Sequence, residues 1–438
     1  MFQYYFLLGV RSLRRNPALT ALMVLTLAIG VAASIATLTI LHVMSGDPIP
    51  NKSSRLFVPL VDNGQPENYK PGDEPNDRQM SYRDAVNLLN SKVGERRTAI
   101  FGVGLPIEPD RKDIGAFTAR GLATTGDFFN MFDSPFLHGQ GWSPADDKSG
   151  ADVIVLSRQL AEKLYGDADP VGKRMLAGGF QYQIVGVLDT WTVVPRFHRV
   201  IGSNDGAFSE EDEMFIPFTS AIRHEMQRNG STSCYEDVAP GYQAFLDSEC
   251  TWIQSWIETR SASDRAELQS FLDSYAIEQR KLGRLKRAAP NMLYDVREWL
   301  DYMKVVGNDN KLSAWLAFGF LVLCLVNTIG LLLAKFSVRA PEVGIRRALG
   351  ASRREIFTQF LIETTVVGLV GGVLGLLLAF GALALIAMQS KALTLVAHMD
   401  WVMLITTFAM AVMSAVLAGL LPTWRACQVT PAIQLKSQ

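Results

Sequence analysis

Long apolar stretches without an acidic or basic residue occur at four places in the chain, one near its start and three near its end. Asp, Glu, Lys and Arg are absent between Arg15 and Asp47, between Lys311 and Lys335, between Glu363 and Lys391, and between Asp400 and Arg425. A helix needs roughly 20 apolar residues to cross a hydrocarbon core of about 30 Å. We therefore predict four transmembrane α-helices, at residues 17–44, 312–335, 356–389 and 401–424.

Residues 45–311 separate the first apolar run from the second and have the mixed polar and apolar composition of a water-soluble domain. Short apolar segments predict strands near 55–61, 151–156, 181–187, 213–218 and 252–257. Helical spacing predicts helices near 81–90, 157–165, 263–279 and 291–303. Because Pro217 cannot donate to a ladder, its strand is expected to be an edge strand or to end there. The pattern predicts a large mixed α/β domain between transmembrane helices 1 and 2.

Positive charge is distributed unevenly around the apolar runs. Basic residues cluster before the first run at Arg11, Arg14 and Arg15, between the second and third runs from Lys335 to Arg354, and after the fourth at Arg425 and Lys436. The link at 390–400 carries only Lys391. Since cytoplasmic loops are rich in Lys and Arg, we predict cytoplasmic termini, a cytoplasmic loop at 336–355 and an extracytoplasmic domain at 45–311. The net charge of −1 gives no indication of a nucleic-acid partner.

Two terminal segments and one alternative complete the predicted topology. Residues 1–16 predict an amphipathic helix on the cytoplasmic surface, and residues 425–438 a cytoplasmic tail. The alternative for the first run is a cleaved signal peptide, because Ala32, Ala33 and Ser34 could form a cleavage site. The run is longer than the apolar region of about 7–15 residues that such peptides contain, which favours an uncleaved span.

The four cysteines fall into two groups. Cys234 and Cys250 both lie in the predicted extracytoplasmic domain, where an oxidising compartment favours a disulfide bond. Such a bond would close a loop of about 17 residues and contribute roughly 3 kcal/mol. The alternative is two free thiols. Cys324 lies in a predicted span and Cys427 in the predicted tail, where each is expected to stay reduced.

No motif in the chain predicts catalysis or metal binding. The five histidines are scattered, and His224-Glu225 lacks a second histidine four residues on, because Arg228 stands there. Residues 166–173 resemble a phosphate-binding loop, but the glycine spacing is one residue too long and Arg174 replaces the required Ser or Thr. We therefore predict no catalytic residue, no metal site and no cofactor bound by this chain.

Four glycines in the third apolar run are spaced so that neighbouring helices can approach closely: Gly368, Gly371, Gly372 and Gly375. Two interpretations are open, packing within one chain and a seam between two copies. Glu363 is a carboxylate at the start of the same run, where it either packs or snorkels at the interface, or relays protons. Asn327 in the second run is expected to form a hydrogen bond between helices.

Residues 340–355 predict a short helix between Pro341 and Gly350, followed by a capping box from Ser352 to Glu355 that starts the next helix. This segment, with residues 359–364 and the glycine-rich run, resembles the signature of MacB/FtsX-type ABC transporter permeases. A second block, from Thr124 to residue 187, resembles the periplasmic core domain of MacB-type permeases. The resemblance covers most of the chain except about 225–250, a divergent insertion that holds both candidate disulfide cysteines.

The resemblance implies a fold, a function and partners. In that family a short cytoplasmic helix docks into the ATPase subunit, so the implied coupling residues are Glu342, Val343, Gly344, Ile345, Arg346, Arg347, Ala348, Leu349, Gly350 and Ala351. The implied protein is a permease without a fused ATPase domain, in the bacterial inner membrane, acting in efflux of a substrate from the periplasm. It would act as a pair of copies with a separate cytoplasmic ABC ATPase that binds ATP. In Gram-negative bacteria such permeases often work with a periplasmic adaptor and an outer-membrane channel. Two alternatives share the layout, an FtsX-like regulator of a cell-wall hydrolase and a lipoprotein-releasing permease.

Overall fold

A computed structural model describes residues 16–427, apart from 68, 112, 202–205, 210, 390–393, 395–396 and 398–400. The described chain divides into two compact units. The helical unit comprises the described residues up to Ser45 and from Val306 onward, and the α/β unit comprises Gly46–Val305. The predicted N-terminal helix, the end of the predicted tail and most of the 390–400 loop lie outside the described residues.

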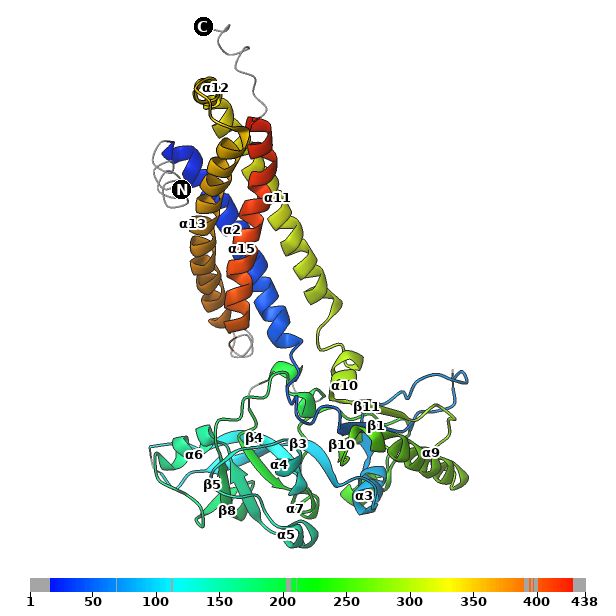
Figure 1. The fold of residues 1–438 in the computed structure, drawn as a ribbon. Coiled ribbons are helices and arrows are strands. Elements are labelled where there is room, and N and C mark those ends of the chain that lie inside the picture. Colours follow the sequence, from blue (N-terminus) through cyan, green and yellow to red (C-terminus); the bar gives the residue numbers. More distant parts are fainter. Residues whose placement is uncertain are drawn as a thin grey trace. The chain divides into compact units, whose positions relative to one another are not determined.

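The helical unit consists of long apolar helices that run side by side (Figure 1). They are α2 (Pro17–Met44), α11 (Asn308–Val338), α13 (Arg353–Ala387) and α15 (Trp401–Cys427). Among the described residues these four helices are long and apolar enough to cross a membrane. A short helix, α12 (Ala340–Ala348), joins α11 to α13. The four predicted spans are therefore confirmed as helices, and α11 extends beyond 312–335 at both ends.

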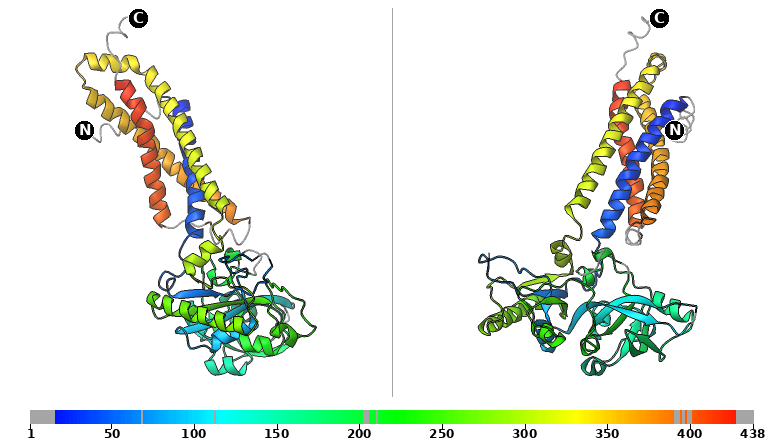
Figure 2. Two further views of the ribbon diagram at one scale, coloured as in Figure 1. Left: turned by 90° about the vertical axis from the view of Figure 1, so that its right-hand side faces the viewer. Right: turned by 180° about the vertical axis from the view of Figure 1, so that it is seen from behind.

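Helix α2 packs against both α11 and α13, and α13 also packs against α15 (Figure 2). Met23, Leu27 and Val31 of α2 are fully or almost fully buried in these contacts. By contrast, Trp315 of α11 and Trp401 of α15 are largely exposed. Large apolar side chains on the outer surface of such a bundle are what a lipid environment requires, since lipid tails are as apolar as the side chains themselves.

The α/β unit is built on a mixed sheet that has eleven strands among the described residues. The strands are β1 (Leu56–Leu60), β2 (Met80–Ser81), β3 (Arg96–Glu108), β4 (Phe117–Thr124), β5 (Phe136–Gly139), β6 (Val153–Leu156), β7 (Arg174–Ala177), β8 (Phe180–Leu188), β9 (Met214–Pro217), β10 (Thr251–Glu258) and β11 (Met292–Asp295). Their order is β11-β1-β10-β3-β4-β9-β6-β8-β5, with β2 beside β10 and β7 beside β3 and β8. Only the β4–β9 and β6–β8 pairs are parallel among these strands.

Short helices and one long helix accompany the sheet (Figure 1). The α-helices are α3 (Tyr82–Asn90), α4 (Asp127–Met131), α5 (Pro144–Ser149), α6 (Arg158–Tyr165), α7 (Phe218–Arg223), α8 (Tyr242–Asp247), α9 (Arg265–Lys281) and α10 (Val296–Tyr302). Three-residue 3₁₀ helices are η1 (Phe197–Arg199), η2 (Gly206–Phe208) and η3 (Ala262–Asp264). Ser81 and Ser157 cap α3 and α6 by accepting backbone N–H bonds, as these residue types do at helix starts. Leu268 of α9 packs with side chains of β1, β10 and β11.

Most elements predicted in this unit are confirmed, and one prediction is wrong. The segment 291–303 is not one helix, because β11 occupies its first part and Asp295 caps α10 after it. The strand predicted at 252–257 is confirmed as β10, and every residue of this strand is buried. Pro217 ends β9, which lies between β4 and β6 and is therefore not an edge strand.

A buried ionic group lies within the aromatic part of the core. We call Arg196, His198, Arg199 and Asp212 the Asp212 cluster. The Asp212 carboxylate is fully buried and forms ion pairs with the guanidinium groups of Arg196 and Arg199. The His198 ring stacks on Trp191 and is fully buried, and this burial holds the pKa of His198 well below its ordinary value. The cluster fixes the η1 segment against the core.

Candidate functional site

Helix α12 has nine residues, and its sequence sets where it begins and ends. Pro341 occupies the first turn, where its missing N–H is not needed. Gly350, just after the helix, has a φ of +101°, a conformation that suits glycine and stops the helix. The Ser352 side chain then caps α13 in a capping box with Glu355. The short helix predicted between Pro341 and Gly350 is confirmed.

The two faces of α12 differ in burial. Val343 and Gly344 are buried, and Val343 packs with Phe336, Ile356 and other side chains of the helical unit. Ile345 and Leu349 point the other way, with 59% and 84% of their surface exposed. The remaining predicted coupling residues are all partly or fully exposed: Glu342, Arg346, Arg347, Ala348, Gly350 and Ala351. This side of α12 therefore leaves an apolar pair beside charged groups open to contact.

Polar contacts hold α12 against α13. The Arg346 guanidinium donates to the Glu342 carboxylate at 2.7 Å on its own helix. It also donates to the side-chain oxygen of Gln359 at 3.0 Å on α13. Arg346 therefore already has structural partners, whereas Ile345 and Leu349 offer their side chains outward.

A buried ionic group joins the end of α11, the residue before α12 and helix α13, and we call Lys335, Arg339 and Glu363 the Glu363 cluster. The Lys335 ammonium nitrogen lies 2.8 Å from one Glu363 oxygen. The Arg339 guanidinium donates to both Glu363 oxygens, at 2.9 and 3.1 Å. Lys335 and Glu363 are almost completely buried. The cluster joins the end of α11 and the residue that precedes α12 to the third turn of α13.

The partners of Glu363 were missed by sequence reasoning, which treated Lys335 and Arg339 as signals of membrane orientation. Their spacing of four residues places both on one helical face, which is the signal that could have paired them with an acid. The ion pairs support the packing interpretation of Glu363. The expectation for Asn327 is wrong, because this residue is exposed on α11 while the neighbouring Thr328 is buried and lies near Thr26 of α2.

The four glycines of α13 face other helices of the same chain. A Cβ added at Gly368 would lie 1.8 Å from the Ala415 Cβ, and one at Gly372 would lie 2.7 Å from the Ala411 Cβ, both on α15. Gly371 and Gly375 similarly approach α2. These close approaches correspond to packing within one chain, the first of the two interpretations.

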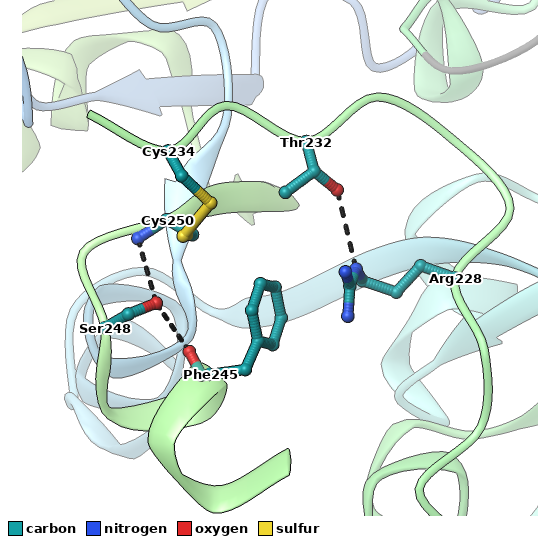
Figure 3. The surroundings of a disulfide bond; sticks show 6 residues. All are labelled: Arg228, Thr232, Cys234, Phe245, Ser248 and Cys250. Atoms are coloured by element: carbon teal, nitrogen blue, oxygen red, sulfur yellow. Dashed lines mark hydrogen bonds between the residues drawn. A yellow bond between two sulfur atoms is a disulfide. The ribbon is translucent and has the colours of Figure 1, made fainter. Parts of the chain in front are cut away.

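Cys234 and Cys250 form a disulfide bond that joins a loop before α8 to the residue preceding β10 (Figure 3). The Ser248 hydroxyl accepts the Cys250 N–H at 3.2 Å and donates to the Phe245 carbonyl at 2.6 Å. The Arg228 guanidinium lies 3.7 Å from the centre of the Phe245 ring, a cation–π contact visible in Figure 3. The segment from Arg228 to Cys250 is therefore held by the disulfide bond and by these polar and cation–π contacts. Within the described part of the chain, no group of three or more His, Cys, Asp or Glu is placed to bind a metal.

Comparison with protein families gives two matches that together cover most of the chain. The family described as MacB-like periplasmic core domain matches residues 20–274, more than half of the chain. The chain belongs to the MacB/FtsX family of permeases. The FtsX-like permease C-terminal domain matches residues 314–431, which contain α11, α12, α13 and α15. The chain is thus a multi-pass membrane protein with a periplasmic domain, and the matched regions are those of a permease.

Curated relatives are distant and longer. The pyoverdine export ATP-binding/permease protein PvdT of Pseudomonas entomophila is 27% identical over 70% of this chain and 41% of its own length. PvdT of Pseudomonas fluorescens Pf-5 is 25% identical over 96% of this chain and 57% of its own. The macrolide export ATP-binding/permease protein MacB of Wolinella succinogenes is 25% identical over 72% of this chain and 43% of its own length. The chain spans about half the length of the curated relatives it matches.

Solved structures of MacB-like periplasmic domains show weaker likeness. The periplasmic region of MacB from Actinobacillus actinomycetemcomitans matches with a TM-score of 0.36 and 12% identity, over 60% of this chain and 96% of that one. The extracellular domain of YknZ from Gram-positive bacteria matches with a TM-score of 0.34 and 15% identity, over 55% of this chain and all of that one. The family assignment therefore rests on the sequence matches.

Proposed function

We propose that this chain is the permease subunit of a MacB-type ABC transporter. It passes movement driven by ATP from a separate cytoplasmic ATPase to its periplasmic domain, and the complex exports a substrate from the periplasm. Permeases of this family pair with ABC ATPases, and the relatives named above are export proteins for pyoverdine and macrolides. The match to the MacB-like periplasmic domain favours export over the FtsX-like regulatory alternative.

The observation that carries the proposal is the construction of α12. One face is anchored by Val343 and the neighbouring Glu363 cluster, while Ile345 and Leu349 extend outward. An element that is exposed for docking and firmly joined to the transmembrane helices can pass a displacement of its partner to them. In this arrangement the α12 end of the helical unit is cytoplasmic, two permease copies act together, and an adaptor and an outer-membrane channel complete the export path.

Glutamate substitutions at Ile345 and Leu349 test the docking role of α12. Both side chains are exposed, so the free energy of unfolding is expected to change by less than about 0.5 kcal/mol. If they are contact residues at the centre of an interface, ATPase binding is expected to weaken by about 30-fold or more. The measurement is co-purification and titration of a candidate ABC ATPase with the permease in detergent.

The matched control is Leu137→Glu, which changes another exposed leucine of the chain, on β5. It is expected to leave ATPase binding unchanged. Wild-type affinity in the doubly substituted α12 variant would overturn the docking role of this helix. Substitution of Arg346 is a less specific test, because it also removes the bonds to Glu342 and Gln359.

A further inference from the structure

Helix α11 leaves most of its surface uncovered by the rest of the helical unit. It packs against α2 and α15 at one side of the bundle (Figure 2). Among the described membrane helices, α11 is the least buried. Its buried side includes Leu321, Cys324 and Thr328. The rest of its surface faces away from the other described helices of the chain.

One line of exposed residues runs along α11 in alternating steps of four and three residues. Such steps form a heptad repeat, which places all members on one helical face and allows two helices to pack along it. Every residue at these positions from Ser313 to Ser337 is exposed. The neighbouring line through Val326 does not stay exposed, because Ile329 and Leu333 are partly buried. We call six residues of the exposed line the Asn327 stripe: Leu316, Phe320, Leu323, Asn327, Gly330 and Ala334.

Asn327 is a polar residue inside the apolar part of this span. It lies 16 residues after Lys311 and eight before Lys335, which corresponds to about 24 Å and 12 Å along the helix. An exposed side chain at this depth faces lipid tails, which form no hydrogen bonds. The exposed hydroxyl of Thr406 on α15 donates to the Val402 carbonyl of its own helix. The amide oxygen of Asn327 has no such solution, because the backbone N–H groups inside a helix are already used, so its donor has to come from another chain.

Small residues follow Asn327 on the same stripe. Gly330 and Ala334 are four residues apart, the spacing that lets two membrane helices approach closely. A Cβ added at Gly330 would meet no atom within 4 Å, whereas one added at Gly368 or Gly372 would meet α15. Glycine weakens a helix relative to alanine, and packing within this chain gives Gly330 no compensating contact. A helix from outside the chain would make use of the space that Gly330 leaves.

We propose that the Asn327 stripe is the seam along which the membrane helices of two copies of this chain meet. In a pair related by a two-fold axis along the membrane normal, the same residue of each copy lies at the axis. An amide both donates and accepts, so the two Asn327 side chains hydrogen-bond to each other. A single asparagine at a core position of a heptad repeat fixes the register of a two-helix pair.

This inference rests on the proposed function, which requires two copies, and it names the contact between them. Asn327 then bonds to a helix of the second copy and to none of its own chain.

Disulfide cross-linking of single cysteines in lipid bilayers tests the seam. Leu323→Cys places a cysteine on the stripe, in a full chain that also carries Cys324→Ala and Cys427→Ala. Val322→Cys is the matched control, since Val322 and Leu323 are equally exposed, at 58% and 56%, and lie at nearly the same depth, but point about 100° apart. With copper phenanthroline as oxidant, Leu323→Cys is expected to form covalent dimers about tenfold faster or more, because the seam holds its two cysteines together.

Two substitutions within the stripe test its contacts, measured over a dilution series of protein in lipid. Asn327→Leu removes the amide pair and is expected to slow cross-linking of Leu323→Cys about threefold, the modest effect of a hydrogen bond between membrane helices. Gly330→Leu blocks the close approach and is expected to slow it about tenfold or more. Gly381→Leu on α13 is the control, because a Cβ at this glycine also meets no atom within 4 Å, and it is expected to leave the rate unchanged.

Equal cross-linking rates of Leu323→Cys and Val322→Cys overturn the proposal, as does a Leu323→Cys rate that neither Asn327→Leu nor Gly330→Leu changes. No ATPase is present in this assay. The α12 variants at Ile345 and Leu349 are expected to cross-link through Leu323→Cys at the wild-type rate, so failure of the seam is distinguishable from failure of the docking test.

Discussion

The Glu363 cluster of the helical unit and the Asp212 cluster of the α/β unit share one arrangement, a buried carboxylate between two cations. The cations of Glu363 come from the end of α11 and from the residue before α12, so separate helices meet there. The cations of Asp212, Arg196 and Arg199, come from one short segment around η1. The same chemistry therefore joins helices in one unit and holds a single loop segment in the other.

The surroundings strengthen this contrast. The His198 ring of the Asp212 cluster lies among aromatic side chains, stacked on Trp191 and Phe132. The Glu363 cluster lies beside α12, the exposed helix of the proposed docking site. Breaking a buried pair is costly wherever it occurs, but replacing the whole group by apolar residues often is not. Such a group therefore mainly fixes how the segments around it are placed. The Asp212 cluster places a core loop, whereas the Glu363 cluster places the helix proposed to dock.

Removal of the acid from each cluster should have the largest effect. Glu363→Gln and Asp212→Asn each leave buried cations without a counter-charge, which is expected to lower the free energy of unfolding by about 3–5 kcal/mol. At temperatures where both variants remain folded, only Glu363→Gln is expected to weaken ATPase binding strongly. Denaturant unfolding and ATPase co-purification measure the two effects. Equal loss of ATPase binding in Asp212→Asn would remove the functional contrast between the clusters.

Replacement of a whole pair separates stability from positioning. The double variant Lys335→Met, Glu363→Leu leaves Arg339, whose long side chain can reach the interface. It is expected to be more stable than Glu363→Gln by about 3 kcal/mol or more, because neither Lys335 nor Glu363 then leaves an unpaired buried charge. ATPase binding is expected to stay weak, since α12 has lost its anchor. If this variant regains both the free energy of unfolding and the ATPase affinity of the wild type, the cluster contributes stability and does not position α12.

A glycine substitution tests whether the helical unit that holds the Glu363 cluster needs the close packing of α13 against α15. Gly368→Ala places a methyl group against Ala415, and such overpacking is expected to cost about 1–3 kcal/mol. Gly381→Ala on the same helix meets no atom within 4 Å and is expected to stabilise by up to about 1 kcal/mol. Thermal unfolding of the two variants gives the comparison. Similar melting temperatures would mean that α15 moves away without cost.

The Asp212 cluster alone of the two contains a histidine, so a pH effect should distinguish them. Burial lowers the pKa of His198 in the folded state, hence the unfolded chain binds the extra proton below about pH 6.5 and stability falls as the pH decreases. The expected slope is about 1.4 kcal/mol per pH unit. In His198→Phe, which keeps an aromatic ring, this contribution should be absent.

The measurement is denaturant unfolding of wild type and His198→Phe at pH 7 and pH 5. Asp147 acts in the opposite direction, because burial raises its pKa to about 6 and the folded state therefore gains stability as the pH falls toward 4. Both proteins keep Asp147, so the difference between them isolates His198. A difference that is constant with pH would show that His198 is not the titrating group.

Elements with a strong apolar pattern could be predicted from the sequence, and those whose pattern is weak could not. The four spans and strands such as β6 consist almost wholly of apolar residues. Strands β3 and β4 were missed, because Gly102, Gly104 and Gly121 interrupt their apolar positions and polar residues flank them. These glycines are explained by contacts distant in sequence: a Cβ at Gly102 would meet the Asn229 carbonyl at 2.1 Å.

The position of α12 in the chain could be predicted from the sequence, but the ion pairs that hold the neighbouring helices together could not. The limits of α12 followed from Pro341 and Gly350, which act locally. The partners of Glu363 lie 24 and 28 residues earlier in the chain, and only the fold brings them together. The error at Asn327 is one of helical phase. Neighbouring residues of a helix point about 100° apart, so Thr328 faces α2 while Asn327 lies on the outer surface of α11.

Strand β3 has a mechanical consequence for the periplasmic domain. Its residues 96–100 pair with β10, and residues 101–107 pair with β4, so the two ladders meet end to end along a strand of about 43 Å. The two halves of the sheet are thus joined through one continuous backbone. A force that pulls them apart along this strand acts on covalent bonds, whereas a torque acts on the soft dihedral angles next to Gly102 and Gly104. The domain should therefore resist stretching and yield to twisting.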